Sequence, residues 1–260
     1  MYEFTANGPA TAQVRVPGGH CSVRAGQGPG VGVRVAPAAS WRSGDRKAAE
    51  NTAVAFEGGV LTVTTDRGSV LSKPRVRVEV VLPPGSAVEF DSDAADLEVH
   101  GPVAALTADS ESGGVKADQV TGDVRLDLSS GDAVLGKVGG CVTFVTSSGA
   151  VRVDHVAGRV AGTSSSGDLR FGVAEGDVLV KTNSGDVRIA TACGGTVSAT
   201  TSSGDVTIGV EEGVGVRPSL STNSGDRRGE LVEGARAGAS GVEVSLDVKT
   251  SSGDITLRRA

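Results

Sequence analysis

The sequence predicts an all-β protein, a β-solenoid similar to a parallel β-helix, and three observations support this prediction. The motif Ser-Ser-Gly-Asp, or a close variant of it, returns at a nearly fixed interval. A second set of glycines falls about midway between these copies. Apolar residues two positions apart occupy the same places in successive copies. A fixed period is the signature of a repeat architecture, so each copy is expected to form one rung of the solenoid.

The repeat period is 18 residues over most of the chain. Successive motif glycines are separated by 18, 18, 18, 18, 19, 21 and 28 residues. They are Gly113, Gly131, Gly149, Gly167, Gly185, Gly204, Gly225 and Gly253. Because another glycine lies near each half-period, each rung is predicted to contain two short strands and two turns. Glycine suits such turns because it reaches positive φ without a steric clash.

Apolar residues line up from one rung to the next. The second position after the motif glycine holds Leu97, Val115, Ala133, Val151, Leu169, Val187, Val206 and Ile255. Such alternation, rich in β-branched residues, predicts strands with one buried face. If each strand pairs in parallel with its copy about 4.8 Å away, two buried columns are expected. They are Val142, Val160 and Val178, and Val153, Phe171 and Ile189.

Residues 1–95 carry no clear motif period and are predicted to form an irregular N-terminal β region that caps the stack. The polar segment Ser40–Asn51 is predicted to be a loop whose last part forms one helical turn. The candidate strands are Gln13–Val16, Cys21–Ala25, Val31–Ala36, Thr52–Phe56, Val60–Thr64, Arg75–Leu82 and Ala87–Phe90.

Residues 96–260 are predicted to form the solenoid itself, regular at first and irregular after residue 205. The whole chain is expected to be one continuous folding unit. Pro218 is expected to break strand pairing because proline has no backbone N–H. The segment 229–241 is predicted to be a long surface loop. Two strands, Val242–Lys249 and Ile255–Arg258, are expected to close the chain.

Composition favours a non-membrane, cytoplasmic protein. The net charge of −6 argues against general binding to nucleic acid or anionic membranes, although a local basic face is compatible with it. No apolar run is long enough for a transmembrane helix, and the first residues do not resemble a secretory signal. The cysteine count is odd, which argues against a disulfide framework. We expect Cys21, Cys141 and Cys193 to be small buried or turn-lining residues.

Aspartates follow the motif glycines and are expected to form an outward column. Because Lys116, Arg152, Arg170 and Arg188 come two residues later, they are expected to neutralise this column. The alternative is a calcium-binding ladder, since nine-residue Gly/Asp repeats bind calcium in β-rolls, but those repeats place aspartate differently. The aspartates are Asp96, Asp132, Asp168, Asp186, Asp205, Asp226 and Asp254.

Hydroxyl side chains form a second outward set, expected to bond one another and the turn backbone. Its members are Thr146, Ser147, Thr163, Thr182, Thr200, Thr201, Ser202, Thr222 and Thr250. The three histidines, His20, His100 and His155, are expected to be scattered surface residues that share no column. No paired carboxylates or nucleophile motif stand out. We therefore assign no catalytic, cofactor-binding or metal-binding residue and expect no enzyme activity and no cofactor.

Three stretches together resemble a bacterial family. They are VRVEVVLPPGSAVEF, the serial SSGDV and NSGDV units, and the closing VKTSSGDITLRR. The chain is similar to β-strand-repeat proteins of the adhesin type, the domain of unknown function 4097 family. The resemblance covers nearly the whole chain and implies a β-helical fold with no established activity.

The expected function is a non-catalytic structural or protein-interaction scaffold with an unknown partner. The alternative is a surface adhesin or carbohydrate-binding β-helix protein. The sequence predicts no nucleic-acid partner and no membrane span.

Overall fold

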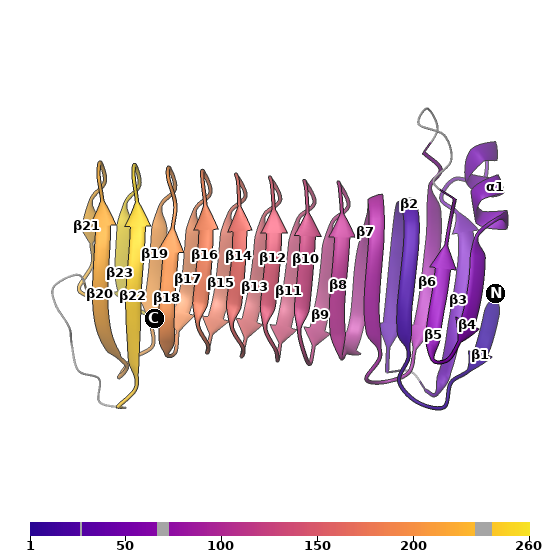
Figure 1. The fold of residues 1–260 in the computed structure, drawn as a ribbon, viewed down its shortest axis with the longest axis horizontal. Coiled ribbons are helices and arrows are strands. Elements are labelled where there is room, and N and C mark those ends of the chain that lie inside the picture. The colour runs from indigo at the N-terminus through magenta and orange to yellow at the C-terminus, as the bar shows by residue number, and fades with distance from the viewer. Residues whose placement is uncertain (27, 67–72, 232–240) are drawn as a thin grey trace. The chain divides into compact units, whose positions relative to one another are not determined.

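The computed structural model describes residues 1–26, 28–66, 73–231 and 241–260 (Figure 1). The long loop predicted for residues 229–241 lies mostly outside these ranges. The described residues form twenty-three strands and one helix, so the all-β prediction is confirmed. The chain divides into two compact units, Met1–Val134 and Leu135–Ala260, called unit 1 and unit 2. The predicted division at residues 95 and 96 stays a prediction.

Unit 2 is a β-solenoid built from two parallel ladders of strands (Figure 1). In spatial order the first ladder contains β12 (Val142–Thr146), β14 (Val160–Ser164), β16 (Val178–Thr182), β18 (Gly195–Thr200), β22 (Glu243–Thr250) and β20 (Gly215–Thr222). The second ladder contains β13 (Val151–Val156), β15 (Leu169–Ala174), β17 (Val187–Ala192), β19 (Val206–Val210), β23 (Ile255–Arg259) and β21 (Arg227–Arg228).

The predicted 18-residue register is confirmed in unit 2. Val160 pairs with Val142 on one side and Val178 on the other. In the second ladder Phe171 pairs with Val153 and Ile189, and all six residues of the two columns are buried. The solenoid interior is therefore made of the apolar columns that the repeat predicts.

One glycine inside the first ladder makes room for an aromatic side chain. Gly162 pairs with Phe144 and Val180 at an inward position. A Cβ atom at Gly162 would collide with the ring of Phe144. The ring of Phe144 also lies 6.4 Å from that of Phe171, centroid to centroid, so the two ladders meet through aromatic contact.

The last rung in sequence is not the last rung in space. Strand β22 lies between β18 and β20, and β23 lies between β19 and β21. The prediction that Pro218 breaks pairing is wrong, because Pro218 lies within β20 and pairs with Leu246. Among the described strands, β20 pairs only with β22, so the missing N–H of Pro218 costs no ladder hydrogen bond on the other side.

Parallel rungs in unit 1 include residues that precede the motif repeats. The long strand β2 (Thr11–Ala25) pairs along most of its length with β7 (Ala87–Val103). Its other side pairs with β5 (Val60–Thr64) and β6 (Val76–Leu82). Two separate strands were predicted within β2, whereas the structure has one strand that bends at Gly18 and Gly19. The rungs then continue through β8 (Ala105–Ser110), β9 (Val115–Val120) and β10 (Val124–Leu128), while β11 (Ala133–Val138) contains the boundary between the units.

Antiparallel strands and a helix cover the far end of unit 1. Strand β1 (Tyr2–Thr5) pairs with β3 (Gly30–Pro37), β3 pairs with β6, and β4 (Ala53–Glu57) pairs with β5. The loop predicted for Ser40–Asn51 is wrong, because Ser43–Glu50 forms the eight-residue helix α1. The buried Asp45 holds α1 against β6 by accepting the backbone N–H of Arg75 at 3.0 Å. Strand β1 was not predicted.

Candidate functional site

The hydroxyl of the residue three positions before each motif glycine caps the turn. In unit 2 the Oγ1 of Thr182 accepts the backbone N–H of Gly185 at 3.1 Å. The same bond is made by Ser110, Thr146, Ser164, Thr201 and Thr222 to the glycine three residues later. The hydroxyl prediction is therefore right for bonding to the turn backbone. Most of these oxygens are buried and face the turn, so they do not offer a surface to a ligand.

The motif glycines are required for a reason that the sequence prediction missed. None of the eight has positive φ, which was the predicted cause. Each regular glycine instead lies against the carbonyl oxygen of the glycine one rung away. A Cβ atom at Gly167 would collide with Gly149, and one at Gly185 would collide with Gly167. Close stacking of turn backbones thus selects glycine.

Aspartates of the second ladder link one rung to the next. The Oδ1 of Asp168 accepts the backbone N–H of Asp186 at 3.1 Å. Asp186 accepts the N–H of Asp205 at 2.9 Å, and Asp205 accepts that of Asp254 at 2.8 Å. Asp254 bonds Asp226 in the same way. In unit 1 Asp96 accepts the N–H of Gly114, and Asp132 follows the motif glycine in its own turn. The outward aspartate column therefore has a structural role in holding rungs together.

Two members of the arginine column form ion pairs along their own strands. The Nε of Arg152 lies 3.0 Å from Asp154, and the Nη2 of Arg170 lies 3.1 Å from Asp168. Arg188, the next member of the column, forms no ion pair with any residue that the structure describes. The predicted neutralisation of the aspartate column by arginine therefore holds for Arg170 but not for Arg188. Lys116, the counterpart in unit 1, is exposed on β9.

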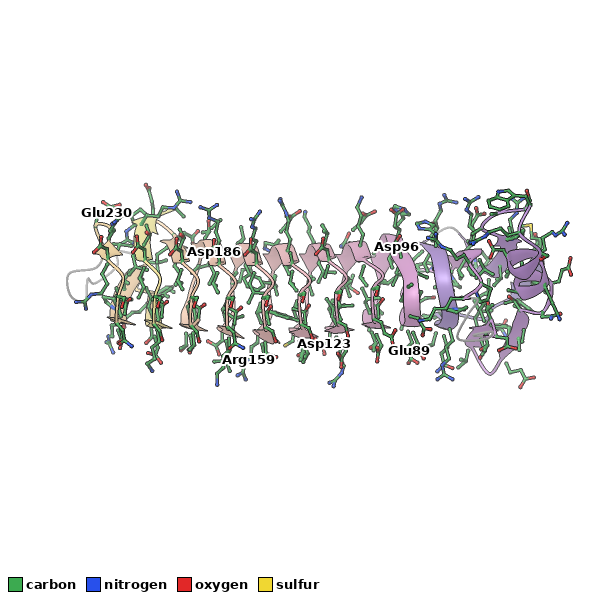
Figure 2. The ribbon with its side chains drawn as sticks, turned by 90° about the horizontal axis from the view of Figure 1, so that it is seen from above. Glu89, Asp96, Asp123, Arg159, Asp186 and Glu230 are labelled. Carbon is green, nitrogen blue, oxygen red and sulfur yellow. The ribbon has the colours of Figure 1, made fainter. Side chains whose placement is uncertain are left out.

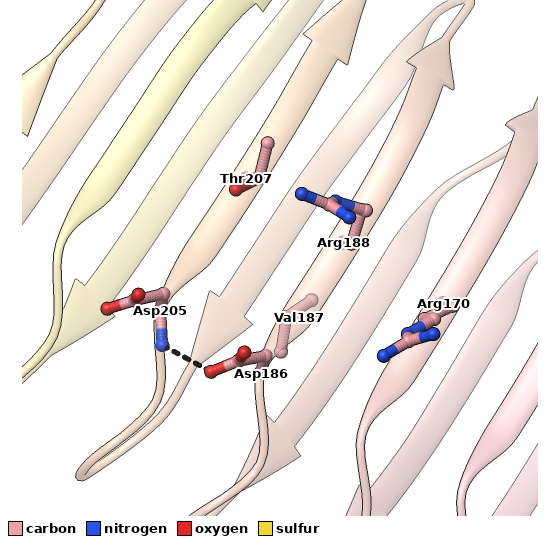
Figure 3. Close-up of a pocket in the computed structure, with 6 residues that line it drawn as sticks. All are labelled: Arg170, Asp186, Val187, Arg188, Asp205 and Thr207. Atoms are coloured by element: carbon pink, nitrogen blue, oxygen red, sulfur yellow. Dashed lines mark hydrogen bonds between the residues drawn. The ribbon is translucent and has the colours of Figure 1, made fainter.

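A shallow hollow lies beside Arg188 on the outward side of β15, β17 and β19 (Figure 3). Its volume is about 130 Å³. It is lined by Arg170, Asp186, Val187, Arg188, Asp205 and Thr207. Arginine and threonine supply hydrogen-bond donors, and the aspartates supply acceptors. We call these outward residues of β15, β17 and β19 the arginine face. Figure 2 shows Asp186 on one side of unit 2 and Arg159 on the other.

Histidines His20 and His100 are neighbours in unit 1, contrary to the prediction that the histidines share no column. Register between β2 and β7 places both close to Glu98, with Nε2–Oε2 distances of 3.9 Å for His20 and 3.5 Å for His100. His100 also contacts Asp118 at 3.1 Å through Nδ1. The sequence contained no signal for this cluster because β2 lies outside the motif period. In unit 2, His155 contacts Glu175 at 2.9 Å.

The three cysteines are free thiols in different surroundings. Cys21 is buried, and burial raises the pKa of its thiol to about 12. Cys193 is partly buried, and its thiol pKa is raised, chiefly by burial and then by Glu211 and Glu175. Cys141 is exposed. The thiols of Cys21 and Cys193 are therefore poor nucleophiles, because the thiolate is the reactive form.

Metal binding finds no support in the side-chain arrangement. Across the part of the chain that the structure describes, no three His, Cys, Asp or Glu side chains come together as metal ligands would. The calcium ladder is also disfavoured because one oxygen of each linked aspartate accepts a backbone N–H. That calcium leaves the melting temperature unchanged stays a prediction.

The repeat, the parallel rungs and the antiparallel cap agree with one known family. The sequence profile described as Toastrack DUF4097 matches residues 43–258. The chain belongs to the Toastrack DUF4097 family. This confirms the resemblance noted from the sequence. The match begins at α1 and leaves out β1, β2 and β3, although β2 is central to the rungs of unit 1. Among curated proteins, no significant match to this Toastrack chain exists.

Several solved structures are similar to this Toastrack protein at low identity. One, from Bacteroides fragilis NCTC 9343, is described as a "putative adhesin"; it is 11% identical with a TM-score of 0.48, and the match covers 98% of this chain and 95% of that chain. A second of the same description, from Parabacteroides distasonis ATCC 8503, is 12% identical with a TM-score of 0.43 and the same coverage. A cell adhesion protein so qualified, from Clostridium sporogenes ATCC 15579, is 13% identical with a TM-score of 0.24, covering 100% and 99%. These values carry no argument about activity.

The single helix of the described structure is far too short to cross a membrane.

Proposed function

We propose that this Toastrack protein is a non-catalytic interaction scaffold that binds a protein partner through the arginine face of unit 2. The observation that carries the proposal is the state of Arg188. Its guanidinium borders the hollow and is left without an ion pair by the residues that the structure describes, while Arg152 and Arg170 in the same column each have one. A cation that is held on a rigid strand and not neutralised is suited to recognising an acidic side chain.

The size and chemistry of the hollow fit a side chain better than a metabolite. Its volume of about 130 Å³ is well below the roughly 300–1,000 Å³ of small-molecule sites. A guanidinium offers two parallel N–H donors to a carboxylate, and arginine is enriched among the residues that dominate protein interfaces. The hydroxyl of Thr207 adds a donor at the rim. We therefore propose an acidic residue of a partner protein as the group that enters the hollow.

Two observations support a role without catalysis. The aspartates beside the hollow already bond backbone N–H groups of neighbouring rungs. The partly buried thiol of Cys193 has a raised pKa, which disfavours the reactive thiolate. Both carboxylates and thiol thus serve the fold in this proposal.

A cytoplasmic location is part of the proposal and is supported by three free cysteines, one of them exposed. The alternative, a surface adhesin or carbohydrate-binding protein, is separated from it by cell fractionation. Recovery of the protein outside the membrane, with Cys141 oxidised, would contradict the cytoplasmic location.

The test is capture of crosslinked partners from the native host with the variant Arg170→Gln/Arg188→Gln as bait. We expect this variant to lose at least about 90% of a partner that the wild type retains, since loss of a central interface arginine commonly costs a tenfold or greater drop in affinity. The matched control is Lys137→Gln/Arg159→Gln, which removes the same charge from exposed positions of unit 2 away from the hollow. Equal retention by the two variants would contradict the proposal, provided both melt at the wild-type temperature.

A further inference from the structure

The N-terminal cap of unit 1 carries exposed residues that the interaction face of unit 2 does not explain. Trp41 is the only tryptophan of the chain, and 81% of it is exposed. Met1 is 86% exposed and Tyr2 is 44% exposed, so three large apolar or aromatic side chains lie open at one region of the sequence-adjacent cap. Exposure of this kind marks a surface that meets a partner or a membrane.

Uncompensated cations lie next to these side chains. Arg42 stacks on Trp41, with its Cζ atom 5.7 Å from the ring centroid. Arg46 and Lys47 follow on α1, and both are exposed. Within the described ranges, none of these three cations forms an ion pair. The neighbouring Asp45 is buried and bonds the backbone of β6, so its carboxylate turns away from them.

The helix fixes the cations toward solvent. Asp45 and Ala48 are the buried residues of α1. They lie three positions apart and therefore share a face of the helix, which packs on the sheet. Arg46 and Lys47 lie on the remaining face. A shallow depression of about 390 Å³ joins Arg46 to Met1, Tyr2 and Val35, which places the apolar residues of β1 and β3 beside this cation.

Charge is distributed unevenly along the chain in a way that favours this end. Residues 1–50 contain six Arg or Lys and three Asp or Glu, a net charge of +3. Since the whole chain carries −6, residues 51–260 carry −9. An anionic surface would attract the first segment and repel the rest, and the repulsion is screened beyond about 8 Å at physiological salt. Such asymmetry selects one orientation on a negative surface.

We propose that Trp41, Arg42, Arg46 and Lys47, with Met1 and Tyr2, form a docking surface for an anionic lipid membrane. Tryptophan prefers the boundary between headgroups and acyl chains, and arginine and lysine bind anionic headgroups. An acidic protein is the other partner that matches the charge. A membrane is favoured because the dominant aromatic side chain is almost fully exposed, whereas anchors of protein interfaces sit in packed pockets. This proposal does not depend on the arginine face.

Trp41 supplies its own reporter, because no other tryptophan contributes to the emission. The full chain is mixed with vesicles of phosphatidylcholine, with or without phosphatidylserine, and both tryptophan emission and co-flotation are measured. We expect a shift of emission to shorter wavelength and co-flotation only with phosphatidylserine, both reversed by high salt. Neither signal at low salt would overturn the proposal, as would equal binding to the uncharged vesicles.

Two variants separate the docking surface from general electrostatics. Arg42→Gln/Arg46→Gln/Lys47→Gln is expected to weaken co-flotation about a hundredfold, at roughly fivefold for each cation near the membrane. The control Lys137→Gln/Arg159→Gln/Lys181→Gln removes the same charge from exposed positions of unit 2 and is expected to bind like the wild type. Trp41→Ala, followed by co-flotation alone, is expected to weaken binding at unchanged melting temperature. Equal loss in the control, or full binding by Trp41→Ala, would overturn the proposal.

Discussion

At the scale of single residues, each position of the repeated motif has a distinct physical task. The hydroxyl of Ser164 accepts the N–H of Gly167, and Asp168 accepts the N–H of the next rung. Gly167 lies where no Cβ atom fits. The sequence predicted a turn at this place, but it suggested positive φ as the cause. Only the stacking of one rung on another shows that the cause is close approach of backbones.

The substitution Gly167→Ala is expected to destabilise the protein by about 1–3 kcal/mol, because the added Cβ meets the backbone carbonyl of Gly149 and overpacks the turn. Urea denaturation measures the loss. Ser165→Ala is the control in the same turn, since Ser165 is exposed and its backbone bonds are unaffected. A loss below about 0.5 kcal/mol for Gly167→Ala would show that the turn backbone can separate at no cost.

The substitution Phe171→Ala is expected to lower the free energy of unfolding by about 3–5 kcal/mol. Its ring is 2% exposed and contacts the ring of Phe144, so removal leaves a cavity between the two ladders. The comparison variant is Leu179→Ala, which truncates a side chain that is 38% exposed. Equilibrium unfolding of both variants decides the matter, and a loss under about 1 kcal/mol for Phe171→Ala would mean that the ring is not enclosed.

At the scale of strands, the sequence predicted what the period encodes and missed what it does not. Strands β12 to β19 repeat every 18 or 19 residues, so their partners and buried columns follow from spacing alone. The place of β22 between β18 and β20 does not follow from any period, because it depends on where the returning chain inserts. The pairing of β2 with β7 is hidden for the same reason, since an antiparallel cap separates the two in sequence.

The register of the first ladder can be tested by disulfide formation. Thr163 pairs with Lys181, and both are exposed. Cysteines at these positions, in a Cys141→Ser/Cys193→Ser background, would have Cα atoms about 4.8 Å apart, within the range for a disulfide. We expect rapid crosslinking on mild oxidation, scored by mass spectrometry. The pair at 163 and 179 is the control, because its diagonal separation of about 8 Å is too long. Faster crosslinking of the control would refute the register.

At the scale of the molecule, both units protect the ends of their rungs without a large globular domain. Antiparallel strands and α1 cover one end of unit 1. In unit 2 the strand β20 carries Pro218, a residue that discourages pairing with further strands. The sequence anticipated atypical terminal rungs. It could not anticipate the candidate site, because Arg152, Arg170 and Arg188 are equivalent by spacing and differ only in the side chains that surround them.

The account of function depends most on that difference between Arg188 and Arg152. Both are arginines of one outward column, but Arg152 is paired with Asp154 and Arg188 is free of ion pairs among the described residues. The decisive measurement is the affinity of the captured partner for Arg188→Gln and for Arg152→Gln, side by side at equal salt. We predict a tenfold or greater loss for Arg188→Gln and less than about a twofold loss for Arg152→Gln. Equal losses, or a larger loss for Arg152→Gln, would contradict the account.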